Sequence, residues 1–147
     1  MSRRALAGLA LAGCAALAGC SGSPDGPKLE PRGAYVPQPP MADMASGYVI
    51  VRNTGDAADR LTSVTSDISD DVQMHRTAGG TMQPADSFAV PAGGEIRFER
   101  GGNHLMLMDL DRKPVRGETV SLVLHFAKSG PVKLKVPVEA TNYAPRK

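Results

Sequence analysis

The chain has 147 residues, which is room for one domain with a core of its own. It holds 17 Lys and Arg against 15 Asp and Glu, and two of the basic residues lie in a leader that export would remove. The mature chain would then be formally neutral. We therefore expect no nucleic-acid partner, because the net charge provides no attraction to one.

Residues 1–19 predict a lipoprotein signal peptide. Two arginines precede an apolar run from residue 5 to 18 that is too short to span a membrane. The run ends in LAGC at 17–20, which resembles the bacterial lipoprotein box, whose cysteine becomes the acylated first residue. A duplicate LAGC ends at Cys14 and leaves a much shorter apolar run before it. We expect the lipid on Cys20 and the domain on the extracytoplasmic face of the cell membrane, with a plain secretory signal as the alternative.

A proline-rich segment follows the leader. Residues 21–40 hold six of the 12 prolines, so we expect a tether over 20–31, a folded domain over 32–140 and a polar tail over 141–147. No cysteine lies beyond Cys20. An exported domain of this composition has no disulfide, and it has no thiolate for catalysis or metal binding.

Beyond the tether, apolar residues alternate with polar ones at a period of two, which is typical of β-strands. Turn signals separate the strands, as at 53–55 and 129–131. The pattern predicts an all-β sandwich or barrel of eight or nine short antiparallel strands. The expected strands lie at 34–36, 48–51, 61–65, 72–77, 87–90, 95–99, 103–110, 119–126 and 132–138.

Histidine and methionine concentrate in one part of the chain. Four of the seven methionines and two of the three histidines lie between residues 74 and 108. In the strand at 103–110, alternation places His104, Met106 and Met108 on one face and two leucines on the other. The leucines are the natural core residues, so we expect the histidine and the methionines to face outward.

The strand at 72–77 shows the same arrangement. Val72 and Met74 are expected in the core, and Gln73 and His75 outside it. Thioether sulfur is a soft ligand that suits Cu(I), and imidazole binds copper as well, whereas blue-copper electron transfer needs a cysteine thiolate. The residues thus favour copper carriage. The alternative is a metal-free β-sandwich interaction module, in which the methionines only fill space.

The chain resembles the PCu(A)C family of extracytoplasmic copper chaperones over residues 29–138. The family motif is a histidine followed by Met-x21-His-x-Met, and here 21 residues separate Met82 from His104-Leu105-Met106. The sequences GYVIVRN at 47–53 and PAGG at 91–94 also look like the family. Six residues separate His75 from Met82, fewer than in the usual motif.

The resemblance implies a cupredoxin-like Greek-key barrel that delivers copper to cytochrome c oxidase through an oxidase subunit or its assembly factor. We expect one Cu(I) ion on His75, Met82, His104 and Met106, with Met108 and Met74 in a possible second tier. A copper-buffering lipoprotein for resistance has the same site and remains an alternative. No catalytic motif appears in its required context, so we do not expect an enzyme.

We predict that Cys20→Ser releases the protein from the membrane or blocks processing of its leader, because stable attachment needs the acyl chains. Membrane fractionation and the mass of the processed chain measure both effects. Cys14→Ser is the matched control and should stay attached. The reverse pattern, with only Cys14→Ser released, would place the lipid on Cys14.

Overall fold

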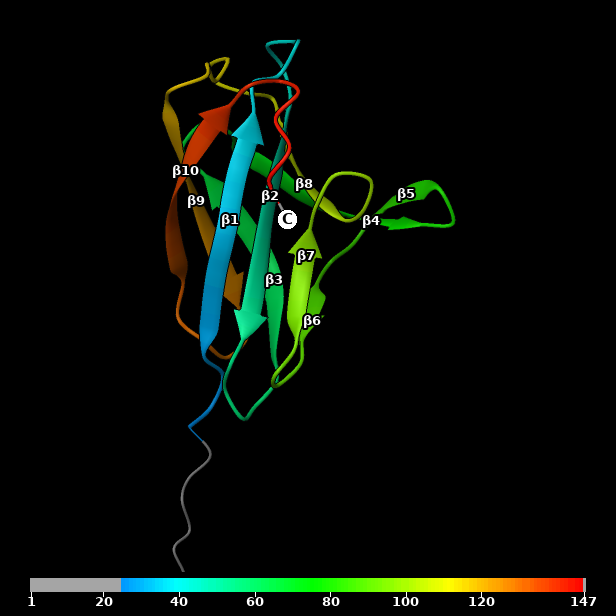
Figure 1. Ribbon diagram of the computed structural model, residues 1–147, viewed down its shortest axis with the longest axis vertical. Helices are drawn as coiled ribbons and strands as arrows, with labels where there is room; N and C mark the ends of the chain where they lie inside the picture. Colours follow the sequence, from blue (N-terminus) through cyan, green and yellow to red (C-terminus); the bar gives the residue numbers. More distant parts are fainter. Residues whose placement is uncertain (1–24, 147) are drawn as a thin grey trace, which may run out of the picture.

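The computed structural model describes residues 25–146, and these residues form ten β-strands and no helix (Figure 1). The predicted leader and Cys20 lie outside the described residues. Within 25–146, no helix is long and apolar enough to cross a membrane. The strands are β1 (Leu29–Pro37), β2 (Ala45–Asn53), β3 (Asp59–Ser66), β4 (Asp71–Ala78), β5 (Thr81–Pro84), β6 (Phe88–Val90), β7 (Glu95–Phe98), β8 (His104–Met108), β9 (Thr119–Phe126) and β10 (Val132–Glu139).

The predicted all-β architecture is confirmed, with one strand more than expected and one parallel pair. The strands are ordered β5-β4-β8-β2-β1-β10-β9-β3-β6, and β7 pairs with β2. Only β1 and β10 run parallel among these pairs, meeting at Val36 and Pro37. The extra strand is β5, whose four residues are all exposed. A strand exposed on both faces shows no alternation, which explains why the pattern did not reveal it.

Two layers of strands enclose the core. In Figure 1, β1, β2 and β7 lie in front and β3, β6 and β9 behind. The core between them is built mainly from valine, leucine and isoleucine. Within it, the rings of Phe88 and Phe98 pack edge to face, with their centroids 4.9 Å apart. β2 joins two parts of the sheet, because its first residues pair with β8 and its later ones with β7.

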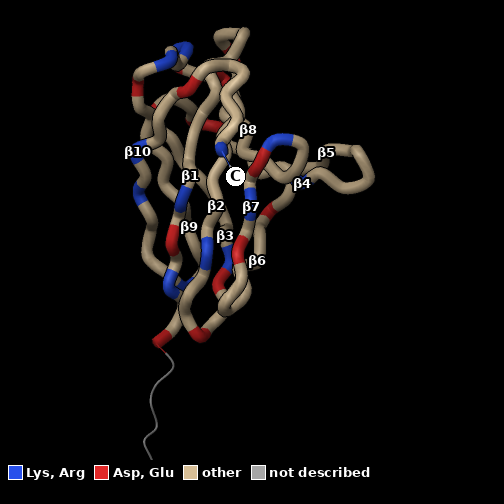
Figure 2. Tube along the Cα trace, in the orientation of Figure 1, with Lys and Arg blue, Asp and Glu red and all other residues tan. Residues whose placement is uncertain are grey.

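The β4–β5 hairpin projects from the side of this barrel (Figure 1). β4 pairs with β8 on one edge and with β5 on the other. Gly79 and Gly80 turn the chain at the tip with φ of 58° and 77°, a left-handed conformation that glycine adopts without steric cost. Residues 77–85 carry no Lys, Arg, Asp or Glu, so the projecting part of the hairpin is uncharged (Figure 2).

Both ends of the described chain contribute to the domain. β1 begins at Leu29, so residues 29–31 of the expected tether form part of a strand. Proline has no backbone N–H to donate to a neighbouring strand. Pro31 is tolerated there because this half of β1 pairs with β2 alone and, within the described residues, has no strand on its other edge to which it would donate. At the other end, the Tyr143 ring packs edge-on against the Tyr35 ring, with the two centroids 5.0 Å apart. Thr141 Oγ1 donates to the Gln38 carbonyl at 2.8 Å.

Candidate metal site

The register between β4 and β8 gathers the polar and sulfur-bearing residues on one face. Residues directly opposite each other in an antiparallel pair point to the same side. His75 lies opposite His104, Gln73 opposite Met106, and Asp71 opposite Met108. The residues that alternate with these positions on β8 are Leu105 and Leu107, and both are fully buried in the core. The faces predicted from the alternation are therefore those observed.

His104 presents one nitrogen to the site. Its ring lies 5.3 Å from that of His75, centroid to centroid, at an interplanar angle of 73°. Its Nδ1 is 3.0 Å from the Gly102 carbonyl oxygen. A carbonyl only accepts, so Nδ1 carries the proton and donates it, and Nε2 of the neutral ring keeps its lone pair. The side chain is only 9% exposed, more enclosed than an outward strand position suggests.

His75 presents its other nitrogen. Its Nε2 is 3.1 Å from Gln73 Oε1, which only accepts, so Nε2 is the protonated nitrogen. Nδ1 then holds the lone pair, and it is buried with no hydrogen-bond partner. Leaving such an acceptor unsatisfied costs about 1–3 kcal/mol. The cost is understandable where the lone pair serves a metal ion, so the donor set fits one.

A chain of hydrogen bonds along β4 orients the His75 ring. Gln73 Nε2 donates to Asp71 Oδ2 at 3.0 Å, which leaves Gln73 Oε1 turned toward the imidazole. All three residues alternate onto the same face of the strand. Groups that hold the far nitrogen of a metal-binding histidine set its tautomer and its ring orientation. Sequence reasoning did not assign this role to Gln73, although its spacing of two from His75 was visible.

The environment of His75 favours its neutral form. Burial lowers its pKa below the ordinary value of 6.5, and the nearby imidazole of His104 lowers it further, because two positive rings repel each other. A neutral ring keeps the lone pair that a metal needs.

Met106 lies in the row next to the two imidazoles. It is half-buried, and Ser46 Oγ donates to its sulfur at 3.6 Å from the neighbouring strand β2. Met108 is one row further away, opposite Asp71. Met74 points to the other face, lies 6% exposed in the core and is paired with Leu105, so the structure does not bring it to the site.

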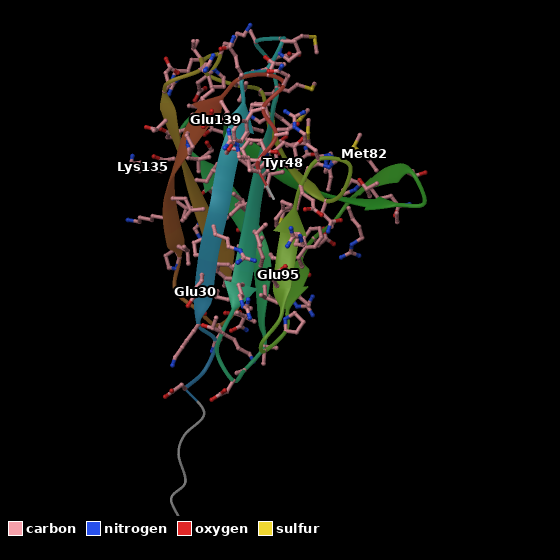
Figure 3. The ribbon with its side chains drawn as sticks, in the orientation of Figure 1. Glu30, Tyr48, Met82, Glu95, Lys135 and Glu139 are labelled. Atoms are coloured by element: carbon pink, nitrogen blue, oxygen red, sulfur yellow. The ribbon has the colours of Figure 1, made fainter. Side chains whose placement is uncertain are left out.

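Met82 lies on the projecting hairpin (Figure 3), and 60% of its surface is exposed to solvent. It lies opposite Thr77, which is two residues from His75 and shares its face. Met82 and His75 are thus diagonal neighbours, and such pairs are roughly 7–8 Å apart between Cα atoms, within reach of a long side chain. Thr77 Oγ1 donates to the Gly102 carbonyl at 2.9 Å, the same oxygen that orients His104.

Comparison with known proteins places this arrangement in a family. The family model described as "Putative lipoprotein LpqE-like" matches residues 29–138. The chain belongs to this LpqE-like family. A relative from Leifsonia xyli subsp. xyli, itself named "Putative lipoprotein", is 33% identical over 101 residues. That match covers 65% of this chain and 61% of the relative, so the chain spans less than two thirds of the relative's length.

Solved structures confirm the resemblance to the PCu(A)C family and its cupredoxin-like fold. The copper-bound PCuAC domain from PmoF2 is 28% identical to this LpqE-like chain, with a TM-score of 0.68, over 77% of this chain and 93% of that domain. The Cu(I) form of DR1885 from Deinococcus radiodurans is 24% identical, with a TM-score of 0.64, over 75% and 77% of the two chains. This second likeness concerns the fold alone.

We predict that the ring of His75 titrates below pH 6.5 in the metal-free protein, for the reasons of burial and repulsion given above. The unfolded chain then binds more protons than the folded one between the two pKa values. The free energy of unfolding should therefore be highest above pH 6.5 and fall as the pH falls through the folded pKa.

Histidine ring resonances followed by NMR give the pKa, and urea unfolding at each pH gives the free energy. His75→Gln assigns the resonance and should lose this part of the pH dependence. A His75 pKa above 6.5 would contradict the buried, neutral ring.

Proposed function

We propose that this protein binds one Cu(I) ion on the outer face of β4 and β8 and carries it as an extracytoplasmic copper chaperone. One observation carries the proposal: the two imidazole rings pack edge to face. In each ring one nitrogen donates to the group that orients the ring, and the other nitrogen keeps its lone pair for a metal. The copper-bound PCuAC domain, at 28% identity, supports copper as the cargo.

The proposed ligands are His75 Nδ1, His104 Nε2, and the sulfur atoms of Met106 and Met82. All four are neutral, and two are thioethers, a set that suits a soft monovalent ion better than Zn²⁺ or Ca²⁺. The imidazoles lie opposite each other where β4 pairs with β8, whereas Met82 lies on the exposed strand β5. Three ligands therefore have fixed positions, and the fourth closes the site from outside.

This division of ligands fits carriage rather than catalysis. Met82 is accessible, so a ligand of an acceptor protein can take its place while the imidazoles still hold the ion. Copper then passes by stepwise exchange of ligands, without release into solution and without change of oxidation state. The uncharged segment 77–85 around Met82 allows an acceptor to approach without displacing an ion pair (Figure 2).

Membrane attachment would place the carrier near its recipient. The family is described as "Putative lipoprotein LpqE-like", and we propose that Cys20 is the lipidated residue. A tether confines the domain to the layer where membrane enzymes lie, which raises its effective concentration there. The proposed recipient is cytochrome c oxidase, through one of its subunits or an assembly factor, as the family resemblance implies.

The ligand set predicts a separation by oxidation state. Met82→Ala with Met106→Ala should weaken Cu(I) binding by more than the roughly 10–100-fold that outer groups cost, and leave Cu(II) binding nearly unchanged, because the harder ion depends on the imidazoles. His75→Ala with His104→Ala should weaken both. Anaerobic titration of the full-length chain against a competing chelator measures Cu(I), and aerobic titration measures Cu(II).

His125→Ala is the matched control, since His125 lies on β9 and its ring contacts Thr65 of the neighbouring strand β3, away from β4 and β8. It should leave both affinities unchanged. Circular dichroism and thermal unfolding should show that each variant folds. If Met106→Ala unfolds the domain while the folded fraction binds Cu(I) normally, Met106 is a packing residue and the proposed ligand set is incorrect.

The recipient is tested in cells that lack this protein. We predict that cytochrome c oxidase loses copper and activity when copper is scarce, and regains both when copper is added. The wild-type chain should complement the defect, and the His75→Ala, His104→Ala chain should not. Normal oxidase together with sensitivity to excess copper would favour the buffering role instead.

A further inference from the structure

A second group of methionines lies beside the proposed site. A cleft of about 230 Å³ opens between the β1–β2 loop and β8, and its lining includes Met41, Met44 and Met106. Three of the six methionines in the described residues thus share one cleft. Met106 is also a proposed ligand of the histidine site, so the two groups meet at a single sulfur atom.

The position of these thioethers does not fit ordinary core packing. Met41 is 56% exposed, and Met44 and Met106 are half-buried, whereas the core methionine Met74 is 6% exposed. Ser46 of β2 lies opposite Met106 of β8, and Met44 precedes Ser46 by two residues. Met44 and Ser46 therefore both form part of the cleft wall next to Met106. These side chains therefore line the cleft and do not fill the core.

The loop that carries Met41 and Met44 is held in place. Gln38 N donates to the Glu139 carbonyl at 2.8 Å, and Gln38 Oε1 accepts from Arg116 N at 2.8 Å. At the other end, Leu110 N donates to the Asp43 carbonyl at 3.1 Å. Two prolines restrict the backbone between these anchors. A ligand in the cleft would therefore meet methionines on a loop that is already ordered.

The chemistry of the cleft selects a soft ion of low charge. Its other lining residues are neutral, apart from Arg100. The Arg100 guanidinium donates to the Thr141 carbonyl at 2.8 Å and lies 5.7 Å from the centre of the Tyr48 ring. Among the described residues, the lining holds no carboxylate or imidazole, and apart from the methionines its side-chain donors are the neutral oxygens of glutamine, serine, tyrosine and threonine. The thioethers are the donors that suit Cu(I), and they bind Zn²⁺ poorly.

We propose that Met41, Met44 and Met106 form a second, all-thioether Cu(I) site in this cleft. The identity of the ion rests on the proposed function, and the site extends that function. An ion in the cleft keeps its bond to Met106 sulfur while the imidazoles of the first site replace the sulfurs of Met41 and Met44. The exchange forms two Cu–N bonds, breaks two Cu–S bonds, and moves no electron or proton. The cleft is thus a loading or unloading position next to the main site.

The experiment is anaerobic Cu(I) titration of the full-length chain with ¹³C-labelled methionine methyl groups. Because Met106 sulfur serves the first ion, the wild-type chain should bind a second, weaker equivalent of Cu(I) on Met41 and Met44, and this equivalent should shift their methyl resonances. Met41→Leu with Met44→Leu keeps the side-chain volume and should weaken the second equivalent by about tenfold or more, with the first unchanged. Met74→Leu is the matched control and should bind both equivalents.

Further outcomes separate this site from the histidine site. His75→Ala with His104→Ala should lose the first equivalent and still shift the methyl groups of Met41, Met44 and Met106. If that variant binds the first equivalent normally, the histidine ligands are incorrect but the cleft site stands. If Cu(I) binds and the Met41 and Met44 methyl groups do not move, the cleft site is overturned. Loss of the first equivalent in Met41→Leu, Met44→Leu would also overturn it, because the two methionines would then belong to a single site.

Discussion

The burial of two leucines on β8 determines the direction of every neighbouring ligand. Leu105 and Leu107 are fully enclosed in the core, and burial of each stabilises the fold by about 1.5–3 kcal/mol. A slip of one residue along β8 would expose both and turn His104 and Met106 into the core. The outward position of the proposed ligands is therefore a consequence of core packing. Their own contacts are too weak to impose it.

A second strand converts this one-sided presentation into a preorganised pair of imidazoles. β4 pairs with β8 so that His75 faces His104, and hydrogen bonds to Gln73 and the Gly102 carbonyl assign a tautomer to each ring. The two nitrogens proposed as copper ligands are thus oriented in the metal-free fold, which would lower the cost of ordering them on binding. The unsatisfied Nδ1 of His75 is the part of this arrangement that the metal-free fold leaves unfavourable.

The exposed methionines lie on either side of these fixed nitrogens. Met82 is on the uncharged tip of the β4–β5 hairpin, residues 77–85, and Met41 is on the loop between β1 and β2. Flexible, neutral sulfur ligands at the edge of a rigid imidazole pair suit a protein that must take up an ion and also give it away. A site enclosed on all sides would bind more firmly and exchange more slowly.

The sequence by itself determined what depends on local periodicity and residue type. Alternation on the strands that became β4 and β8 assigned each side chain to a face. The absence of cysteine beyond Cys20 excluded a thiolate site in the folded domain, and the spacing from Met82 to Met106 indicated the family. Only the tertiary structure decided which strands meet and in which register. His75 and His104 are 29 positions apart, and a period of two carries no information about a partner strand. The same holds for β5, for Gln73 and Gly102 as orienting groups, and for the cleft that unites Met41 with Met106, because each arises from contacts between segments that are distant along the chain.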